Sequence, residues 1–270
     1  MKHYKLSILA ITIGTVFMVP TQAALVSGFE GASVFGDTDS TAGSTTCPLC
    51  DSTVSFAVWK NESGNWLNDS FFSGAGTATA LAPFSSSVDT TANYVYLYQV
   101  NNTDPLAPPE QELENFNISF GPVGTAVPFT SGGYFDGTVF SGLSSALVPL
   151  DVPNNHTPSL LTSVGNLVAG VGVNPDGLSQ HVITSNAVQN SALPAEGMLY
   201  SWNVGNEIQP GAASSVVFLT SNKAPVYQWA ETESPGGSGT AGDVPSVPVP
   251  ATLPLLALGL IGIRRFRGKK

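Results

Sequence analysis

Apolar and polar side chains alternate along much of this chain, with the two-residue period of a β-strand. In the segment 94–100, Tyr94, Tyr96, Tyr98 and Val100 would line one face of a strand. The same alternation occurs at 54–59, 116–120 and 198–204, with shorter runs at 215–220 and 225–229. No long window has the 3.6-residue period of an amphipathic helix. The pattern therefore predicts an all-β body.

Turn-forming residues separate these runs. They are Gly64-Asn65, Gly121-Pro122, Gly132-Gly133, the segment 174–177 and Pro210-Gly211. Roughly nine or ten short strands joined by such turns predict an antiparallel β-sandwich, with the immunoglobulin fold as a candidate topology. The alternation also predicts that each sheet has one face toward solvent.

Positively charged residues are gathered at the two ends of the chain. Nine Lys and Arg accompany 19 Asp and Glu, and between residues 24 and 243 the only cations are Lys60 and Lys223. All 19 acids lie in that span, which therefore has a formal charge of −17. This balance argues against nucleic-acid binding, which depends on clustered Lys and Arg. It indicates an acidic body that is solvated or binds external cations.

The N-terminus has the three-part layout of a secretory signal peptide. A basic start with Lys2 and Lys5 precedes an apolar run at 6–19, and small residues precede a predicted cleavage site after Ala23. The apolar run is short for a membrane span, which needs roughly 20 residues. We therefore expect residues 1–23 to form a signal helix that directs export and is removed. An uncleaved N-terminal anchor is the alternative.

The composition of the C-terminal region changes from Gly and Ser to Pro and then to apolar residues. Residues 234–246 are rich in Gly, Ser and Pro and predict a linker after a β-sandwich body at 24–233. Residues 251–263 are apolar and predict a hydrophobic helix, followed at once by Arg264 and Arg265. The positive-inside rule places this basic end in the cytoplasm and the body outside.

The order of residues at 247–270 resembles the PEP-CTERM sorting signal of Gram-negative bacteria. The matching positions are Pro248, Pro250, Ala251, the Leu/Gly-rich run at 253–263, and the basic residues Arg264, Arg265 and Arg267. The sequence departs from the family pattern at Val249, where the family usually has Glu. An ordinary single-span tail anchor is the alternative.

This resemblance implies a destination and partners for the chain. Such tails follow passage through the export machinery and are handled by an exosortase-like membrane enzyme. The protein is anchored transiently in the inner membrane before it reaches the cell surface or an extracellular polysaccharide matrix. A similar tail ends some ice-binding proteins, so the tail does not define the activity of the body. Regular Thr arrays of the kind that bind ice are absent from the sequence.

Cys47 and Cys50 form a Cys-x-x-Cys motif. Export to an oxidising compartment favours a local disulfide between them, or two free thiols. Thioredoxin-type redox chemistry and a zinc site are the alternatives. A zinc site would need two further ligands at suitable spacing, and the sequence has no second Cys-x-x-Cys.

No catalytic constellation emerges from the sequence. His156 and His181 are expected to have structural or solvated roles, and the segment 142–146 lacks the second Gly of a nucleophile elbow. Glu110, Glu112 and Glu114 are spaced by two residues. Like charges on one strand face repel, so this spacing favours a solvated acidic loop over a pair of catalytic carboxylates.

The segment beginning at Asp37 and Asp39 starts like a calcium-binding loop, but Ala42 and Pro48 stand where an EF-hand needs Gly and Glu. A looser calcium site stays open, and no other cofactor is expected. We therefore expect a non-enzymatic surface or matrix protein that binds exopolysaccharide or cations. A secreted hydrolase acting on polysaccharide and an ice-binding protein are the alternatives.

Overall fold

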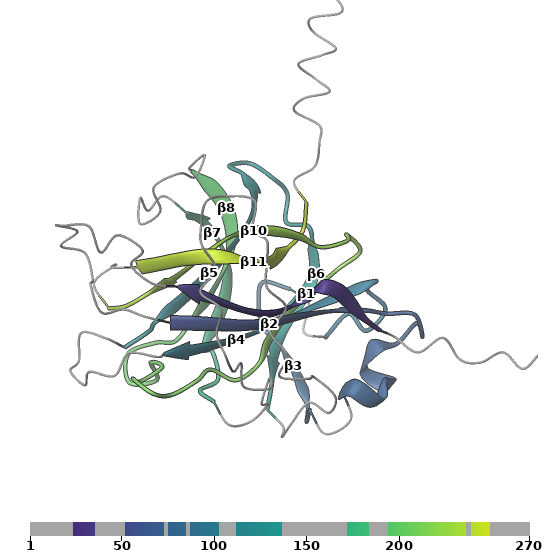
Figure 1. Cartoon of the computed structure of the whole chain (residues 1–270), viewed down its shortest axis with the longest axis horizontal. Helices are drawn as coiled ribbons and strands as arrows, with labels where there is room; N and C mark the ends of the chain where they lie inside the picture. The colour runs from purple at the N-terminus through teal and green to yellow at the C-terminus, as the bar shows by residue number, and fades with distance from the viewer. Residues whose placement is uncertain are drawn as a thin grey trace, which may run out of the picture.

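Two antiparallel sheets packed face to face form the body, which confirms the predicted all-β class (Figure 1). The computed structural model describes residues 24–35, 52–72, 75–84, 87–102, 112–136, 172–183, 194–235 and 239–248. The first sheet has the order β1 (Ala24–Phe35), β2 (Ser52–Lys60), β4 (Tyr94–Asn102), β9 (Val217–Ser221), β6 (Phe129–Phe135) and β3 (Ala78–Ala80). The second has the order β11 (Gly239–Ser246), β10 (Val226–Glu233), β5 (Asn115–Pro122), β8 (Ala195–Ser201) and β7 (Gly177–Ile183).

The order of these strands differs from that of the immunoglobulin fold. In that fold one sheet holds strands ABED and the other holds CFG. Here β1, β2, β3 and β4 all belong to the first sheet, whereas the third strand of the immunoglobulin fold lies in the sheet opposite to the first two. The prediction of an antiparallel sandwich is confirmed, and the immunoglobulin-like topology was wrong for the described strands.

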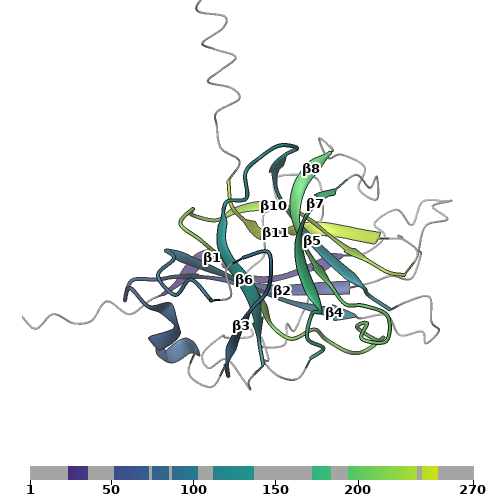
Figure 2. The ribbon, with the colours of Figure 1, turned by 180° about the vertical axis from the view of Figure 1, so that it is seen from behind.

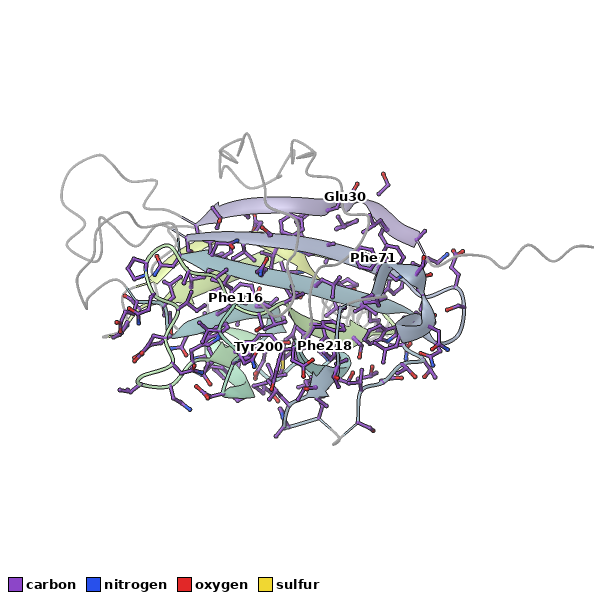
Figure 3. All side chains as sticks on the ribbon, turned by 90° about the horizontal axis from the view of Figure 1, so that it is seen from below. Glu30, Phe71, Phe116, Tyr200 and Phe218 are labelled. Carbon is purple, nitrogen blue, oxygen red and sulfur yellow. The ribbon has the colours of Figure 1, made fainter. Side chains whose placement is uncertain are left out.

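Aromatic and aliphatic side chains fill the space between the sheets. Tyr98 of β4 and Phe116 of β5 are fully buried and meet edge to face, with ring centroids 5.7 Å apart. Tyr200 of β8 is also fully buried, and Figure 3 shows Phe116 and Tyr200 among the side chains enclosed by the ribbon. Figure 2 shows β5, β7 and β8 from the opposite side of the molecule. Most residues that the alternation placed on one face therefore belong to the main core. Val204 is the exception, because β8 ends at Ser201 and Val204 is 91% exposed.

The outer face of the first sheet carries a second apolar core. Two short 3-10 helices, η1 (Trp66–Asn68) and η2 (Ser70–Phe72), contribute aromatic side chains to it. Phe71 stacks on Trp59 of β2 with ring centroids 4.2 Å apart, and Figure 3 shows Phe71 on the helical segment beside the strands. The buried members of this cluster are Ala57, Trp59, Trp66, Phe71, Phe72, Ala75, Val95, Leu97, Phe135, Val216 and Phe218.

The prediction of one solvent-facing side per sheet was therefore wrong for the first sheet. In β2 and β4 several residues between the core positions are themselves apolar and buried, namely Ala57, Trp59, Val95 and Leu97. Strands buried on both faces have near-continuous apolar sequences, so their alternation carries less information about solvent exposure.

Gly132 and Gly133 lie inside β6 and not in the predicted turn. A Cβ atom on Gly133 would overlap the backbone carbonyl of Thr79 in β3. The glycine pair therefore allows close approach of neighbouring backbone, which is the other common reason for glycine inside a strand.

The predicted signal helix at 1–23 and the predicted hydrophobic helix at 251–263 lie outside the described residues. Within the described part of the chain, no helix is long and apolar enough to cross a membrane.

Candidate functional site: the last strand and the sorting motif

The C-terminal part of the body is a strand where the sequence predicted a linker at 234–246. β11 pairs with β10 along its whole length, from Glu233 opposite Gly239 to Val226 opposite Ser246. It is the edge strand of the second sheet. Pro245 is compatible with this place because a proline, which lacks an N–H donor, is tolerated in edge strands. The body therefore extends past residue 233, and the linker prediction was wrong for 239–246.

Side chains from other strands fix the end of β11 to the core. The buried Tyr98 hydroxyl donates a hydrogen bond to the carbonyl oxygen of Pro245. The Ser246 hydroxyl donates to the carbonyl oxygen of Ser119 in β5, at 2.8 Å. Val247, one residue beyond the strand, is fully buried and belongs to the main core. The chain is therefore packed into the body up to Val247.

The first and last strands of the body lie against each other (Figure 1). A Cβ atom on Gly242 would come within 2.6 Å of the ring of Phe35, so glycine allows β11 to approach β1. Farther along, the Tyr227 hydroxyl of β10 donates to the carbonyl oxygen of Gly28 at 2.7 Å, and its ring stacks on Phe29. These contacts close one side of the sandwich where the two sheet edges meet.

Comparison with known protein families finds a match immediately after this packed strand. The matched residues are 246–270, described as the PEP-CTERM protein-sorting motif. The chain carries a PEP-CTERM sorting motif. No curated protein and no solved structure matches the chain. The PEP-CTERM motif implies export in a Gram-negative bacterium, with transient membrane association and processing by an exosortase-type membrane enzyme.

The PEP-CTERM motif begins inside the folded body. Its first residue, Ser246, is the last residue of β11, and its second residue, Val247, is in the core. Of the predicted sorting residues, the structure describes Pro248, which is half-buried. The others, Pro250, Ala251, Arg264, Arg265 and Arg267, lie outside the described residues, as do the predicted cleavage residue Ala23 and the cysteines Cys47 and Cys50.

Four glutamates gather near the loop that precedes β5. Burial, together with the negative charges of Glu207, Glu112 and Glu233, raises the pKa of Glu114. The backbone N–H of Glu114 donates to the carbonyl oxygen of Glu233 at 2.9 Å, which brings the ends of β5 and β10 together. The acidic loop predicted around Glu112 and Glu114 thus meets two acids distant in sequence. Among the described residues, no three His, Cys, Asp or Glu side chains are placed to hold a metal ion.

A second charged group lies at the β7–β8 edge of the second sheet. His181 is exposed on β7, opposite Gly197 of β8. Glu196 accepts hydrogen bonds from the backbone N–H of Gly124 at 2.9 Å and from the side-chain amide of Gln180 at 2.8 Å. These bonds, in that order, lower the pKa of Glu196, and the nearby His181 lowers it further. His156, Glu110, Asp37, Asp39 and the segment 142–146 lie outside the described residues.

The tryptophans at 59, 66 and 202 serve the two cores. Trp59, Trp66 and Trp202 are 7%, 0% and 1% exposed, so their rings are not presented to a sugar ligand. The indole N–H of Trp66 donates to the carbonyl oxygen of Asp89 at 2.9 Å, and that of Trp202 donates to the carbonyl oxygen of Val173 at 3.0 Å.

The sequence analysis did not identify the residues that fix the end of β11. Tyr98 and Ser119 belong to no sequence motif, and the alternation of side chains assigns them only to strands.

Proposed function

We propose that this chain is a non-enzymatic protein of the cell surface or of an extracellular polysaccharide matrix, delivered there through its C-terminal tail. The observation that carries the proposal is the PEP-CTERM motif at 246–270, attached directly to a packed β-sandwich. An apolar run with a basic end after an exported body is the arrangement that a membrane processing enzyme would meet at the outer face of the inner membrane.

The charge of the body supports a role in a hydrated, cation-containing matrix. Between residues 24 and 243 the chain has 19 acids and two cations, Lys60 and Lys223. Lys60 forms a 2.8 Å ion pair with Glu62 on the surface. With so few internal counter-charges, most carboxylates interact with water, hydrogen-bond donors or external cations such as calcium. This acidity keeps the body soluble and favours divalent-cation bridges to acidic polysaccharide.

The proposal is tested by fractionating the native host and measuring the intact mass of the protein in each fraction. The expected product begins at Ala24, lacks the basic end at 264–270 and is found at the cell surface or in the matrix. Deletion of residues 264–270 supplies a control in which the basic end needed for retention and recognition is removed. Full-length protein that persists in the inner membrane with residues 264–270 attached would contradict the sorting function.

A further inference from the structure

We propose that the body restrains the processing of its own tail, because the sorting motif begins in residues that must leave the core before an enzyme can bind them. This inference rests on the proposed sorting function and concerns its regulation. A processing enzyme holds its substrate in an extended form on both sides of the bond that it cuts, usually by main-chain hydrogen bonds and side-chain pockets. Ser246 and Val247 are fully buried, so neither is available to such a cleft while β11 is docked.

The short distance between the packed Val247 and the apolar run means that the enzyme must act close to the folded body. From Val247 to Ala251, where the apolar run begins, the chain has four Cα–Cα steps. Fully extended, those steps span roughly 14 Å. An enzyme acting at the Pro248–Pro250 segment therefore works within that distance of the folded body. The linker that would separate a folded domain from its sorting signal is, in this chain, strand β11 itself.

Release of β11 is a local event in this fold. β11 is the edge strand of the second sheet and pairs with β10 on one side. Proteins open locally, and such openings need less free energy than unfolding of the whole domain. The pairing with β10 and the packing of Val244 and Gly242 hold the strand along its length. At its C-terminal end the opening is opposed by the Tyr98–Pro245 bond, the Ser246–Ser119 bond and the burial of Val247. When opening is fast compared with cleavage, the cleavage rate follows the population of the open form.

The test compares two tyrosine variants that differ in which strand they release. Tyr98→Phe removes the hydroxyl that holds Pro245 and changes no residue of the sorting motif. Tyr200→Phe is the matched control, because its equally buried hydroxyl donates to the carbonyl oxygen of Phe218 in β9, away from β11. Loss of one such bond favours an open form by about fivefold. We expect Tyr98→Phe to accelerate tail removal about fivefold in pulse-chase measurements, and Tyr200→Phe to process at the wild-type rate.

A spacer variant keeps the test independent of the stability of either tyrosine mutant. Insertion of Gly-Ser-Gly-Ser between Val247 and Pro248 separates the first two residues of the matched motif from the rest, and it is designed to leave β11 docked and Pro248-Val249-Pro250 intact. It should accelerate tail removal, and adding Tyr98→Phe to it should give no further gain, since both changes relieve the same restraint. The same insertion after Val204, which is 91% exposed, is the control and should leave processing unchanged.

Two results would overturn the inference while leaving the sorting function in place. One is wild-type processing rates in both the Tyr98→Phe and the spacer variants. The other is equal acceleration by Tyr98→Phe and Tyr200→Phe, which would indicate general loosening of the body. Absence of any shortened product from the wild-type chain, in a host that processes other tails of this type, would instead contradict the proposed function.

Discussion

The hydroxyl of Tyr98 in β4 donates a hydrogen bond to the carbonyl oxygen of Pro245, 147 residues farther along the chain. The bond joins the first sheet to the edge strand of the second, across the main core. Burial raises the pKa of Tyr98 well above its usual value, so the hydroxyl stays protonated and remains a donor at every physiological pH. A structural bond of this kind, two residues before Val247, makes the start of the sorting motif part of the domain.

Removal of this hydroxyl should loosen the end of the chain more than the rest. Tyr98→Phe is expected to lower the free energy of unfolding by about 1 kcal/mol, since a buried carbonyl loses its donor. Hydrogen exchange should rise mainly in residues 242–247. Tyr200→Phe should cost a similar amount without raising exchange in that segment. Equal exchange in β11 for both variants would show that the Tyr98 bond has no local role.

Gly242 should not tolerate a side chain. In Gly242→Ala the new Cβ would meet the ring of Phe35 at 2.6 Å, and one of the two must move. We expect a loss of about 1–3 kcal/mol, as for other overpacked core positions. The loss should be smaller when Phe35 is also changed to Leu, which shortens the side chain at the contact. Urea denaturation of the wild type, the two single variants and the double variant measures this coupling, and strictly additive losses would contradict the packing argument.

The aromatic cluster on the outer face of the first sheet should be essential for stability. Phe72 contacts Trp59, Trp66 and Phe135, with ring centroids 4.9–5.9 Å away. Phe72→Ala is expected to cost about 3–5 kcal/mol, the range for truncation of a buried phenylalanine. Val204→Ala, at a 91% exposed position, is the control and should change stability by less than about 0.5 kcal/mol. Thermal unfolding followed by tryptophan fluorescence would detect the difference.

The glutamate cluster should make the body less stable as pH rises. The raised pKa of Glu114 means that folding disfavours its charged form. Its contribution to the stability of the fold is therefore present at pH values below its pKa in the unfolded chain, 4.5, and is lost as the pH rises through its pKa in the folded protein. Glu114→Gln should therefore raise the melting temperature at pH 7 and have little effect at pH 4. A stabilising effect of the same size at both pH values would contradict this explanation.

Glu196 supplies a control of opposite sign. The pKa of Glu196 is lowered, so its charged form stabilises the fold at pH values above its unfolded pKa of 4.5. That stabilisation is lost as the pH falls through the pKa of Glu196 in the folded protein. Glu196→Gln should lower the melting temperature at neutral pH, because the carboxylate accepts bonds from Gly124 and Gln180. The difference from wild type should shrink in acid, and calorimetry across the pH range checks both variants.

Calcium should stabilise the acidic body beyond simple screening. Binding to the folded state raises the melting temperature by mass action, while salt of equal ionic strength only weakens repulsion among the carboxylates. We expect millimolar calcium to raise the melting temperature more than matched sodium chloride. Equal shifts in the two salts would leave the acidity as a solubility property and would remove the support for cation bridging in the matrix.

Alternation alone predicted the central strands correctly. The segments around Val54, Tyr96 and Ile118 became β2, β4 and β5, and the residues placed on one face became the main core. It could not predict the second core, because its aromatic half comes from η1 and η2, whose residues 66–72 show no strand period. The glycine pair at 132–133 was assigned to a turn, since close backbone approach depends on a neighbour that is distant in sequence.

Composition was misleading at the C-terminal end of the body. β11 has the amino-acid composition of a flexible linker, including Gly242, Pro245 and Ser246. These residues form a strand because tertiary contacts stabilise it where local strand propensity is low. Among these contacts are the hydrogen bond from Tyr98 to Pro245 and the one from Ser246 to Ser119. The sorting motif itself was recognised from its residue order, because membrane-directed signals are linear and need no fold to be read.

The side-by-side arrangement of β1 and β11 has a consequence for how the body crosses a membrane. Phe35 in β1 contacts Gly242 in β11. Gly28 in β1 accepts a hydrogen bond from Tyr227, whose partner in β11 is Pro245. The first residues of β1 and the last residues of β11 therefore lie at the same end of the body. In the export that the sorting motif implies, β1 would emerge before β11, and the second sheet would gain its edge strand only after Ser246 had crossed. Completion of the sandwich would thus coincide with arrival of the tail in the membrane.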